Sequence, residues 1–251
     1  MTPISAFRPD LFAGRTVVVS GATSGIGLDI ARGFARLGAN VTGTGSSAQK
    51  LAELAGSGEP GIAFEALDVR SKEAITAFAS RFETIDVLVN AAGIARPVAE
   101  WDDETFLDVI DVNLVSQFRL ASAFRPALEA TGGAVVNFAS MLSYLADTAV
   151  PAYAASKTGV LGLTRTLAHA WGPQGIRVNA VAPGYHKTDM TKPIWSNPDG
   201  EKAVSVRTAL KRWGTTEDLV GAVLFLCSPA ATYITGTCLD IDGGFLSGNP
   251  L

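Results

Sequence analysis

A glycine-rich turn between a short apolar run and a helical pattern is the feature that most restricts the fold of this chain. Residues 16–20 read TVVVS, as a buried strand does, and GATSGIG follows directly at residues 21–27. A helical pattern of apolar residues then extends over residues 26–37. The glycines allow a tight turn, close approach of a pyrophosphate and close packing of the helix, whose first N–H groups would face the phosphates. The pattern therefore predicts a dinucleotide-binding site.

Short apolar runs alternate with longer helical patterns along all 251 residues. The runs lie near residues 16–20, 40–44, 62–67, 86–90, 134–139, 177–182 and 238–241. Such alternation predicts an α/β protein whose parallel sheet is covered by helices on both faces through right-handed crossovers. In a sheet of this kind the ligand binds at the carboxyl ends of the strands.

Composition narrows the possible partners. The chain is 47% hydrophobic and 18% charged, which suits one domain spanning residues 1–251. A net charge of −4 without a basic stripe argues against a nucleic-acid partner. Cys227 and Cys238 fit no metal-ligand pattern, so we expect no metal site. No apolar stretch approaches the ~18 residues that span a bilayer, so we expect a cytoplasmic protein without a membrane partner.

A tyrosine and a lysine four residues apart, Tyr153 and Lys157 in YAASK, form a candidate acid–base pair. On a helix this spacing puts both side chains on one face. A phenol, whose pKa is ordinarily about 10, acts near neutral pH only when a nearby cation lowers that pKa. The pair therefore predicts proton transfer at Tyr153, with Lys157 as the cation.

The glycine-rich turn, YAASK and the motifs between and after them resemble the short-chain dehydrogenase/reductase family. In the family's order, the further motifs are Leu67-Asp68-Val69, Asn90-Ala91-Ala92-Gly93, Asn113 in DVNLVSQ, Ser140 in NFASMLSY, Arg177-Val178-Asn179, Pro183-Gly184 with Thr188, and Asp240-Ile241-Asp242-Gly243-Gly244. The resemblance covers nearly the whole chain. It implies a single-domain, Rossmann-type doubly wound parallel sheet of about seven strands. It also implies an NAD(P)-dependent oxidoreductase that interconverts a secondary alcohol and a ketone.

The resemblance assigns catalytic roles to four residues. Tyr153 would exchange a proton with the substrate oxygen, and Ser140 would hydrogen-bond the same oxygen. Lys157 would lower the pKa of Tyr153 and bind the nicotinamide ribose. Asn113, on the long helix after the fourth strand, would hold a water that links the lysine to solvent.

Cofactor contacts follow from the same resemblance. Asp68 would accept a hydrogen bond from the adenine amino group, and His186, where the family often has an aliphatic residue, would contact the nicotinamide amide through its main chain. The full expected set is Gly21, Thr23, Ser24, Gly25, Ile26, Gly27, Thr44, Ser46, Ser47, Asp68, Val69, Asn90, Ala91, Gly93, Tyr153, Lys157, Pro183, Gly184, His186 and Thr188.

The choice between NAD and NADP depends on the end of the second strand. Enzymes that prefer NAD usually carry an acid there, whereas this chain has Gly45. The arginines that typically bind a 2′-phosphate are also missing, because Ser24 and Ser46 stand at those positions. Hydroxyl groups of Thr44, Ser46 and Ser47 could hydrogen-bond a phosphate. We favour NADP(H), with NAD as the alternative.

The expected substrate is a small, partly polar carbonyl compound of the sugar, polyol or keto-alcohol type. The predicted pocket wall consists of Arg96, Met141, Leu142, Tyr144, Tyr185, Met190 and Trp195. A 3-oxoacyl-(acyl-carrier-protein) reductase is an alternative, although the segments 129–131 and 173–174 lack the basic residues that would bind an acidic carrier. A dinucleotide-binding sensor without turnover is a second alternative.

Two further expectations concern the loop over the site and the assembly. Residues 188–215, which contain two prolines and a glycine between helical fragments, would form a substrate loop that covers the site. The resemblance also implies a homotetramer with two-fold symmetry, built on the helices near 104–125 and 152–171 and on the C-terminal strand.

Overall fold

The computed structural model describes residues 3–248, and its seven strands form one sheet. The strands are β1 (Thr16–Ser20), β2 (Asn40–Gly45), β3 (Ile62–Ala66), β4 (Val87–Asn90), β5 (Ala134–Phe138), β6 (Arg177–Pro183) and β7 (Cys238–Ile241). They pair in parallel in the order β3-β2-β1-β4-β5-β6-β7. The predicted Rossmann-type doubly wound sheet is therefore confirmed. Its strand order reverses at the neighbouring strands β1 and β4, where such sheets bind ligands.

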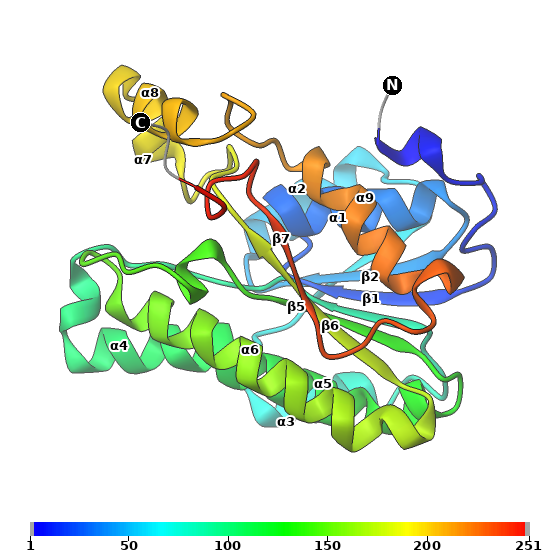
Figure 1. Ribbon diagram of the computed structural model, residues 1–251. Coiled ribbons are helices and arrows are strands. Elements are labelled where there is room, and N and C mark those ends of the chain that lie inside the picture. The colour runs from blue at the N-terminus through cyan, green and yellow to red at the C-terminus, as the bar shows by residue number, and fades with distance from the viewer. Residues whose placement is uncertain (1–2, 249–251) are drawn as a thin grey trace.

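Helices cover both faces of the sheet (Figure 1). One face carries α1 (Gly25–Arg36), α2 (Ala48–Ser57) and α9 (Glu217–Cys227), and the other carries α3 (Lys72–Ala79), α4 (Asp103–Ile110), α5 (Ser116–Glu129) and α6 (Pro151–Trp171). The short helices α7 (Lys192–Trp195) and α8 (Pro198–Arg207) lie beyond one end of the sheet. The predicted substrate loop thus contains two helices. Among residues 3–248, no helix is long and apolar enough to span a bilayer.

Strand β1 shows how the apolar runs build two cores. Val17 and Val19 point to the face covered by α1 and α9, whereas Val18 points to the face covered by α3, α5 and α6. All three side chains are completely buried. A strand buried on both faces needs a continuous apolar run rather than an alternating one, which explains the TVVVS pattern.

The helix that carries Asn113 is not regular. A single π-helical turn, Asp111–Val115, joins α4 to α5. Turns of this kind widen the helix locally and often occur at functional sites. Asn113 lies within the turn and is completely buried.

Helices α1 and α9 pack closely because Gly33 has no side chain. A Cβ atom at Gly33 would lie 2.5 Å from Cγ1 of Val220 in α9. The sequence pattern predicts a helix here, but the need for glycine inside it arises from the packing between the helices.

We expect Gly33→Ala to lower the free energy of unfolding by about 1–2 kcal/mol, because overpacking against Val220 outweighs the gain in helix propensity. The matched control is Gly162→Ala in α6, where no atom lies within 4 Å of the added Cβ. The free energy of unfolding of that variant, measured with urea, should rise by about 0.5–1 kcal/mol. Adding Val220→Ala should reduce the cost of Gly33→Ala. Equal stabilisation by the two alanines would contradict this account of the packing.

Candidate active site

A cavity of about 460 Å³ opens along the carboxyl ends of the strands. It is lined by loops after β1, β2, β3, β4, β5 and β6 and by the first turns of α6. The predicted residues that line it are Gly21, Thr23, Ser24, Gly25, Ile26, Gly27, Ser46, Ser47, Asp68, Val69, Ala91, Gly93, Arg96, Ser140, Tyr153, Lys157, Pro183, Gly184, His186, Thr188 and Met190. Side chains far apart in the sequence thus meet in one site, as the predicted topology requires.

Two predicted cofactor residues do not line the cavity. Thr44 is the second-last residue of β2 and Asn90 is the last residue of β4, and both are completely buried. The Nδ2 atom of Asn90 donates to Oδ1 of Asn137 across the sheet at 2.9 Å.

Five of the seven residues predicted to form the substrate pocket do not line this cavity, although Tyr185 lines a smaller one that also includes His186. Met141, Leu142, Tyr144, Tyr185 and Trp195 are absent from the cavity lining. Met141 is buried in the turn after β5. The ring of Tyr185 packs edge-on against Trp213 and Phe245. The indole N–H of Trp195 donates to the carbonyl oxygen of Thr188 at 2.9 Å, so this ring holds the loop together.

The glycine-rich turn fits a pyrophosphate. Gly21 has a φ of +71°, and a Cβ atom there would lie 2.6 Å from the backbone of Ala92. A Cβ atom at Gly27 would lie 2.3 Å from the carbonyl oxygen of Gly21. Within the described residues, the side chain of Ser24 does not cap the N-terminus of α1. The N–H groups of the first turn therefore face the cavity and remain available to an anion, which matches the group that a dinucleotide would place there.

Ser140, Tyr153 and Lys157 meet at the inner end of the cavity. Nζ of Lys157 donates to the carbonyl oxygen of Phe138 at 2.8 Å and lies 5.4 Å from the centroid of the Tyr153 ring. The lysine is only 3% exposed, and burial lowers its pKa to about 7. A buried ammonium that loses its proton this easily is suited to exchanging protons near neutral pH.

The predicted lowering of the Tyr153 pKa by Lys157 stays a prediction. Burial raises the pKa of Tyr153 above its ordinary value, and the negative charge of Glu100 adds to the rise. A hydrogen bond with the Ser140 hydroxyl opposes it.

Asn113 lies behind the cavity rather than in its lining. Its Oδ1 accepts from the N–H of Ile94 and its Nδ2 donates to the carbonyl oxygen of Ile94, both at 2.8 Å. Nδ2 also lies 3.3 Å from Oγ of Ser156 in α6. The side chain therefore joins the loop after β4 to the helix that carries Tyr153. The predicted water at this residue stays a prediction.

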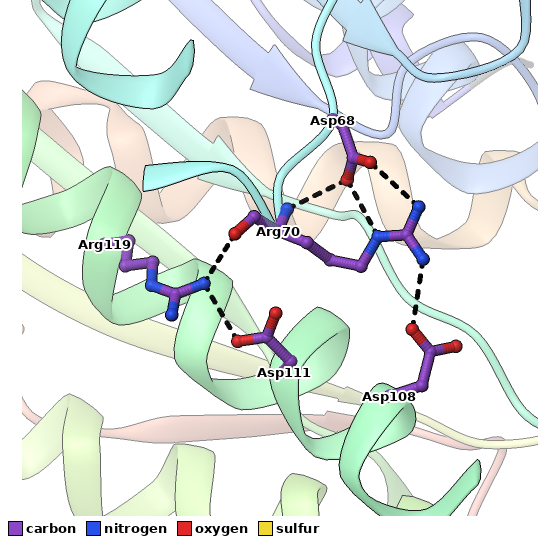
Figure 2. A network of polar contacts seen from close by, with 5 residues as sticks. All are labelled: Asp68, Arg70, Asp108, Asp111 and Arg119. Atoms are coloured by element: carbon purple, nitrogen blue, oxygen red, sulfur yellow. Dashed lines mark hydrogen bonds and ion pairs between the residues drawn. The ribbon is translucent and has the colours of Figure 1, made fainter. Parts of the chain in front are cut away.

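An ionic network surrounds Asp68 at the far end of the cavity (Figure 2). Arg70 donates to Asp68 through Nε at 3.0 Å, through Nη2 at 2.8 Å and through its backbone N–H at 3.0 Å. These bonds lower the pKa of Asp68. Arg70 also donates to Asp108 of α4 at 3.1 Å. A carboxylate has about four acceptor positions, so one position of Asp68 remains available for the predicted hydrogen bond from an adenine amino group.

Sequence reasoning missed Lys50, which lines the cavity from the first turn of α2. Its Nζ donates to Oγ of Ser24 at 2.9 Å and lies 3.7 Å from Oδ2 of Asp189. Ser47 caps the same helix by accepting from the N–H of Lys50 at 3.3 Å. The signal available in the sequence was a lysine three and four residues after Ser47 and Ser46, a spacing that keeps all three residues on one side of the start of the helix.

His186 lines the cavity but has a structural environment. The residue is 4% exposed, and its Nδ1 lies 3.2 Å from the carbonyl oxygen of Gly184. Its ring fills the space beside Gly214. Burial lowers its pKa, which keeps the ring neutral at pH 7. Among residues 3–248, no three His, Cys, Asp or Glu side chains gather in a way that could hold a metal ion.

Several known proteins are similar to this chain in sequence. A family profile described as Enoyl-(Acyl carrier protein) reductase matches residues 21–246. The 2-dehydro-3-deoxy-D-gluconate 5-dehydrogenase of Bacillus subtilis is 41% identical over 247 residues, which cover 93% of this chain and 95% of that protein. Galactitol 2-dehydrogenase (L-tagatose-forming) of Cereibacter sphaeroides is 40% identical over 252 residues, which cover 96% and 97%. Proteins named 3-oxoacyl-[acyl-carrier-protein] reductase are also among the relatives.

Solved structures agree with the sequence relatives. A gluconate 5-dehydrogenase from Burkholderia cenocepacia, in complex with NADP and tartrate, superposes with a TM-score of 0.88 at 31% identity, covering 96% of this chain and 98% of that chain. With the profile match and the relatives above 30% identity, the sequence resemblance is confirmed. The chain belongs to the short-chain dehydrogenase/reductase family and is an NAD(P)-dependent dehydrogenase.

Proposed function

We propose that this enzyme interconverts a hydroxyl and a keto group on a small sugar acid, with NADP(H) as its cofactor. The observation that carries the substrate class is Arg96, whose exposed guanidinium lines the same cavity as Tyr153. Its one hydrogen bond in the described structure runs to the neighbouring carbonyl oxygen of Ala95 at 3.3 Å, and it forms no ion pair there. An unpaired guanidinium at a catalytic cavity is suited to binding a carboxylate in a bidentate manner.

The relatives support the same substrate class. Two of them are named for gluconate or for a keto derivative of deoxygluconate, both sugar acids, and one was solved with tartrate, a hydroxy acid. Another relative is named for galactitol, a neutral polyol, so the same fold accommodates both kinds of substrate. Arg96 is the feature of this chain that favours the acid.

The proposed catalysis is proton handling around a bound nicotinamide cofactor, which supplies the hydride chemistry. The first turn of α1 would hold the pyrophosphate, and Lys157 would face the nicotinamide ribose. In alcohol oxidation, Tyr153 takes the hydroxyl proton at its phenolate oxygen and Lys157 stabilises that charge. Ser140 orients the substrate oxygen through its hydroxyl, which also hydrogen-bonds the phenol.

Lys50 supports the choice of NADP(H). Its ammonium lies beside Ser24 in a cavity also lined by Ser46 and Ser47, so a cation and several hydroxyl groups surround the place proposed for the 2′-phosphate. The acid typical of NAD enzymes has no room at Gly45, where a Cβ atom would lie 2.5 Å from the side chain of Thr23. Asp189, which is 85% exposed and faces Lys50, can turn toward solvent when a phosphate arrives.

Two alternatives stay open to experiment. The relatives named as 3-oxoacyl-[acyl-carrier-protein] reductases favour an acyl-carrier substrate, and turnover of acetoacetyl carrier protein but not of sugar acids would select it. A sensor without catalysis would bind NADPH and turn over neither. The homotetramer, the single domain over residues 1–251 and the cytoplasmic location are also predictions for this enzyme.

The first prediction concerns Tyr153. We expect Tyr153→Phe to lower kcat for gluconate oxidation at least about 100-fold, because phenylalanine cannot accept the proton. Its affinity for NADPH, measured by fluorescence titration, should stay near that of the wild type. The control is Tyr233→Phe, because the side chain of Tyr233 is fully exposed. Wild-type turnover by Tyr153→Phe would remove the proposed mechanism.

The second prediction concerns Lys50. Lys50→Gln should raise the Kd for NADPH about 10-fold, because one charge-assisted contact to the 2′-phosphate is lost, and leave the Kd for NADH unchanged. Lys72→Gln, at the exposed start of α3, provides the matched control. If both cofactors weaken equally, Lys50 does not recognise the phosphate.

The third prediction concerns Arg96 and compares an acid with a neutral polyol. We expect Arg96→Gln to lower kcat/KM for gluconate roughly 10- to 100-fold, because the carboxylate loses its charged partner. The value for galactitol, which has no carboxylate, should change much less. Steady-state assays with NADP⁺ measure both. Equal losses of kcat/KM with gluconate and with galactitol would show that Arg96 does not bind the carboxylate.

A further inference from the structure

Glu100 is a completely buried carboxylate at the back of the proposed active site. It lies in the short 3₁₀ turn Ala99–Trp101 after β4. One carboxylate oxygen accepts from the N–H of Arg96 and the other accepts from the N–H of Tyr153, each at 2.8 Å. A charged side chain is rarely buried unless its hydrogen-bonding capacity is used, and here both oxygens have backbone donors.

The bond to Tyr153 caps the catalytic helix from a distant part of the chain. The N-cap residue of α6 is Val150, whose side chain has no oxygen to accept from the first N–H groups. Glu100, 53 residues earlier, accepts from one of them. Its negative charge also lies at the positive end of the helix dipole. The start of α6 is therefore fixed by the loop after β4.

Other bonds tie the same two segments together. The N–H of Val98 donates to the carbonyl oxygen of Ala149 at 2.7 Å, and the indole N–H of Trp101 donates to that of Thr148 at 3.0 Å. Val98 has a φ of +69°. A β-branched residue in this region is strained, and such strain persists where surrounding contacts hold the backbone in place. These bonds thus hold the segment 98–101 in a backbone conformation that Val98 does not favour.

We propose that Glu100 is a positioning residue that fixes Tyr153 and Arg96 relative to each other, so that the proton acceptor and the carboxylate-binding group meet the substrate in one geometry. The inference rests on the proposed function, since it takes Tyr153 as the base and Arg96 as the anion-binding group. It adds a residue to that function that touches neither substrate nor cofactor.

The carboxylate also acts on Tyr153 through its charge. Lys157 of α6 lies over the ring of Tyr153, and Ser140 and Glu100 act on its phenol. The other charged or titratable side chains that line the same cavity are Arg96, His186, Lys50, Asp68, Arg70, Asp108 and Asp189. The charge of Glu100 raises the pKa of Tyr153. Removing that charge should lower the pKa, so the phenolate would form at a lower pH.

The test is the pH dependence of gluconate oxidation by Glu100→Gln. Oxidation needs the phenolate, so its rate rises as pH passes the pKa of Tyr153. In Glu100→Gln the rise should move to lower pH by roughly half a unit to one unit, because a buried negative charge is lost nearby. The KM for gluconate should also increase, since the glutamine amide cannot accept from both backbone N–H groups. A residue that only stabilised the fold would lower activity without moving the rise.

Two further variants keep the test decisive. Glu104→Gln removes a charge from the exposed first turn of α4 and should leave the profile unchanged. Glu100→Asp keeps the charge but is one methylene shorter, so the rise should stay at the wild-type pH while kcat falls roughly 10- to 100-fold. If Glu100→Gln does not fold, the kcat of Glu100→Asp tests the positioning role of Glu100.

The outcomes separate this inference from the proposed function. A wild-type profile in Glu100→Gln, or wild-type kcat in Glu100→Asp, overturns the role of Glu100 while an inactive Tyr153→Phe leaves the proposed function intact. Full turnover by Tyr153→Phe overturns the proposed function instead. A shifted rise in Glu100→Gln together with an unshifted, slower Glu100→Asp supports the positioning role.

Discussion

The hydrogen bond from Lys157 to the carbonyl oxygen of Phe138 determines where the rest of the site lies. Burial of an ammonium is costly, and a carbonyl at the last residue of β5 offsets part of that cost. Gln117 of α5 also donates to this carbonyl at 3.2 Å and accepts from the N–H of the same residue. The end of β5 is thereby bonded to both α5 and α6, which fixes the height of Tyr153 above the sheet.

The loop after β4 is held by two buried side chains. Asn113 binds both backbone groups of Ile94, and Glu100 binds the N–H of Arg96. The π-helical turn has a part in this arrangement because it carries Asn113 toward the loop. A site made of loops from six strands can hold its geometry because these loops are fastened to regular elements.

Charges along the cavity are distributed in a way that suits a ligand with anionic groups. At one end Arg70 is paired with both Asp68 and Asp108, so its positive charge is offset there. Lys50 brings a partly exposed cation to the middle of the cavity, beside the serine hydroxyl groups. Arg96 brings another to the end near Tyr153. The site thus offers cations where the proposed phosphate and carboxylate would lie.

The sequence by itself determined the seven strands, the glycine-rich turn and the pairing of Tyr153 with Lys157, because each depends on residues within one or two turns or one strand of each other. Only the tertiary structure decided the places of Lys50, Glu100 and Tyr185. Glu100 reads as one more acid in a polar segment until the fold buries it against a helix 53 residues away. The contact of the Tyr185 ring with Trp213 likewise joins residues that lie far apart in the sequence. Burial and long-range contacts determine the charge state and the direction of a side chain. The spacing of residues along the sequence predicts neither the burial nor the contacts.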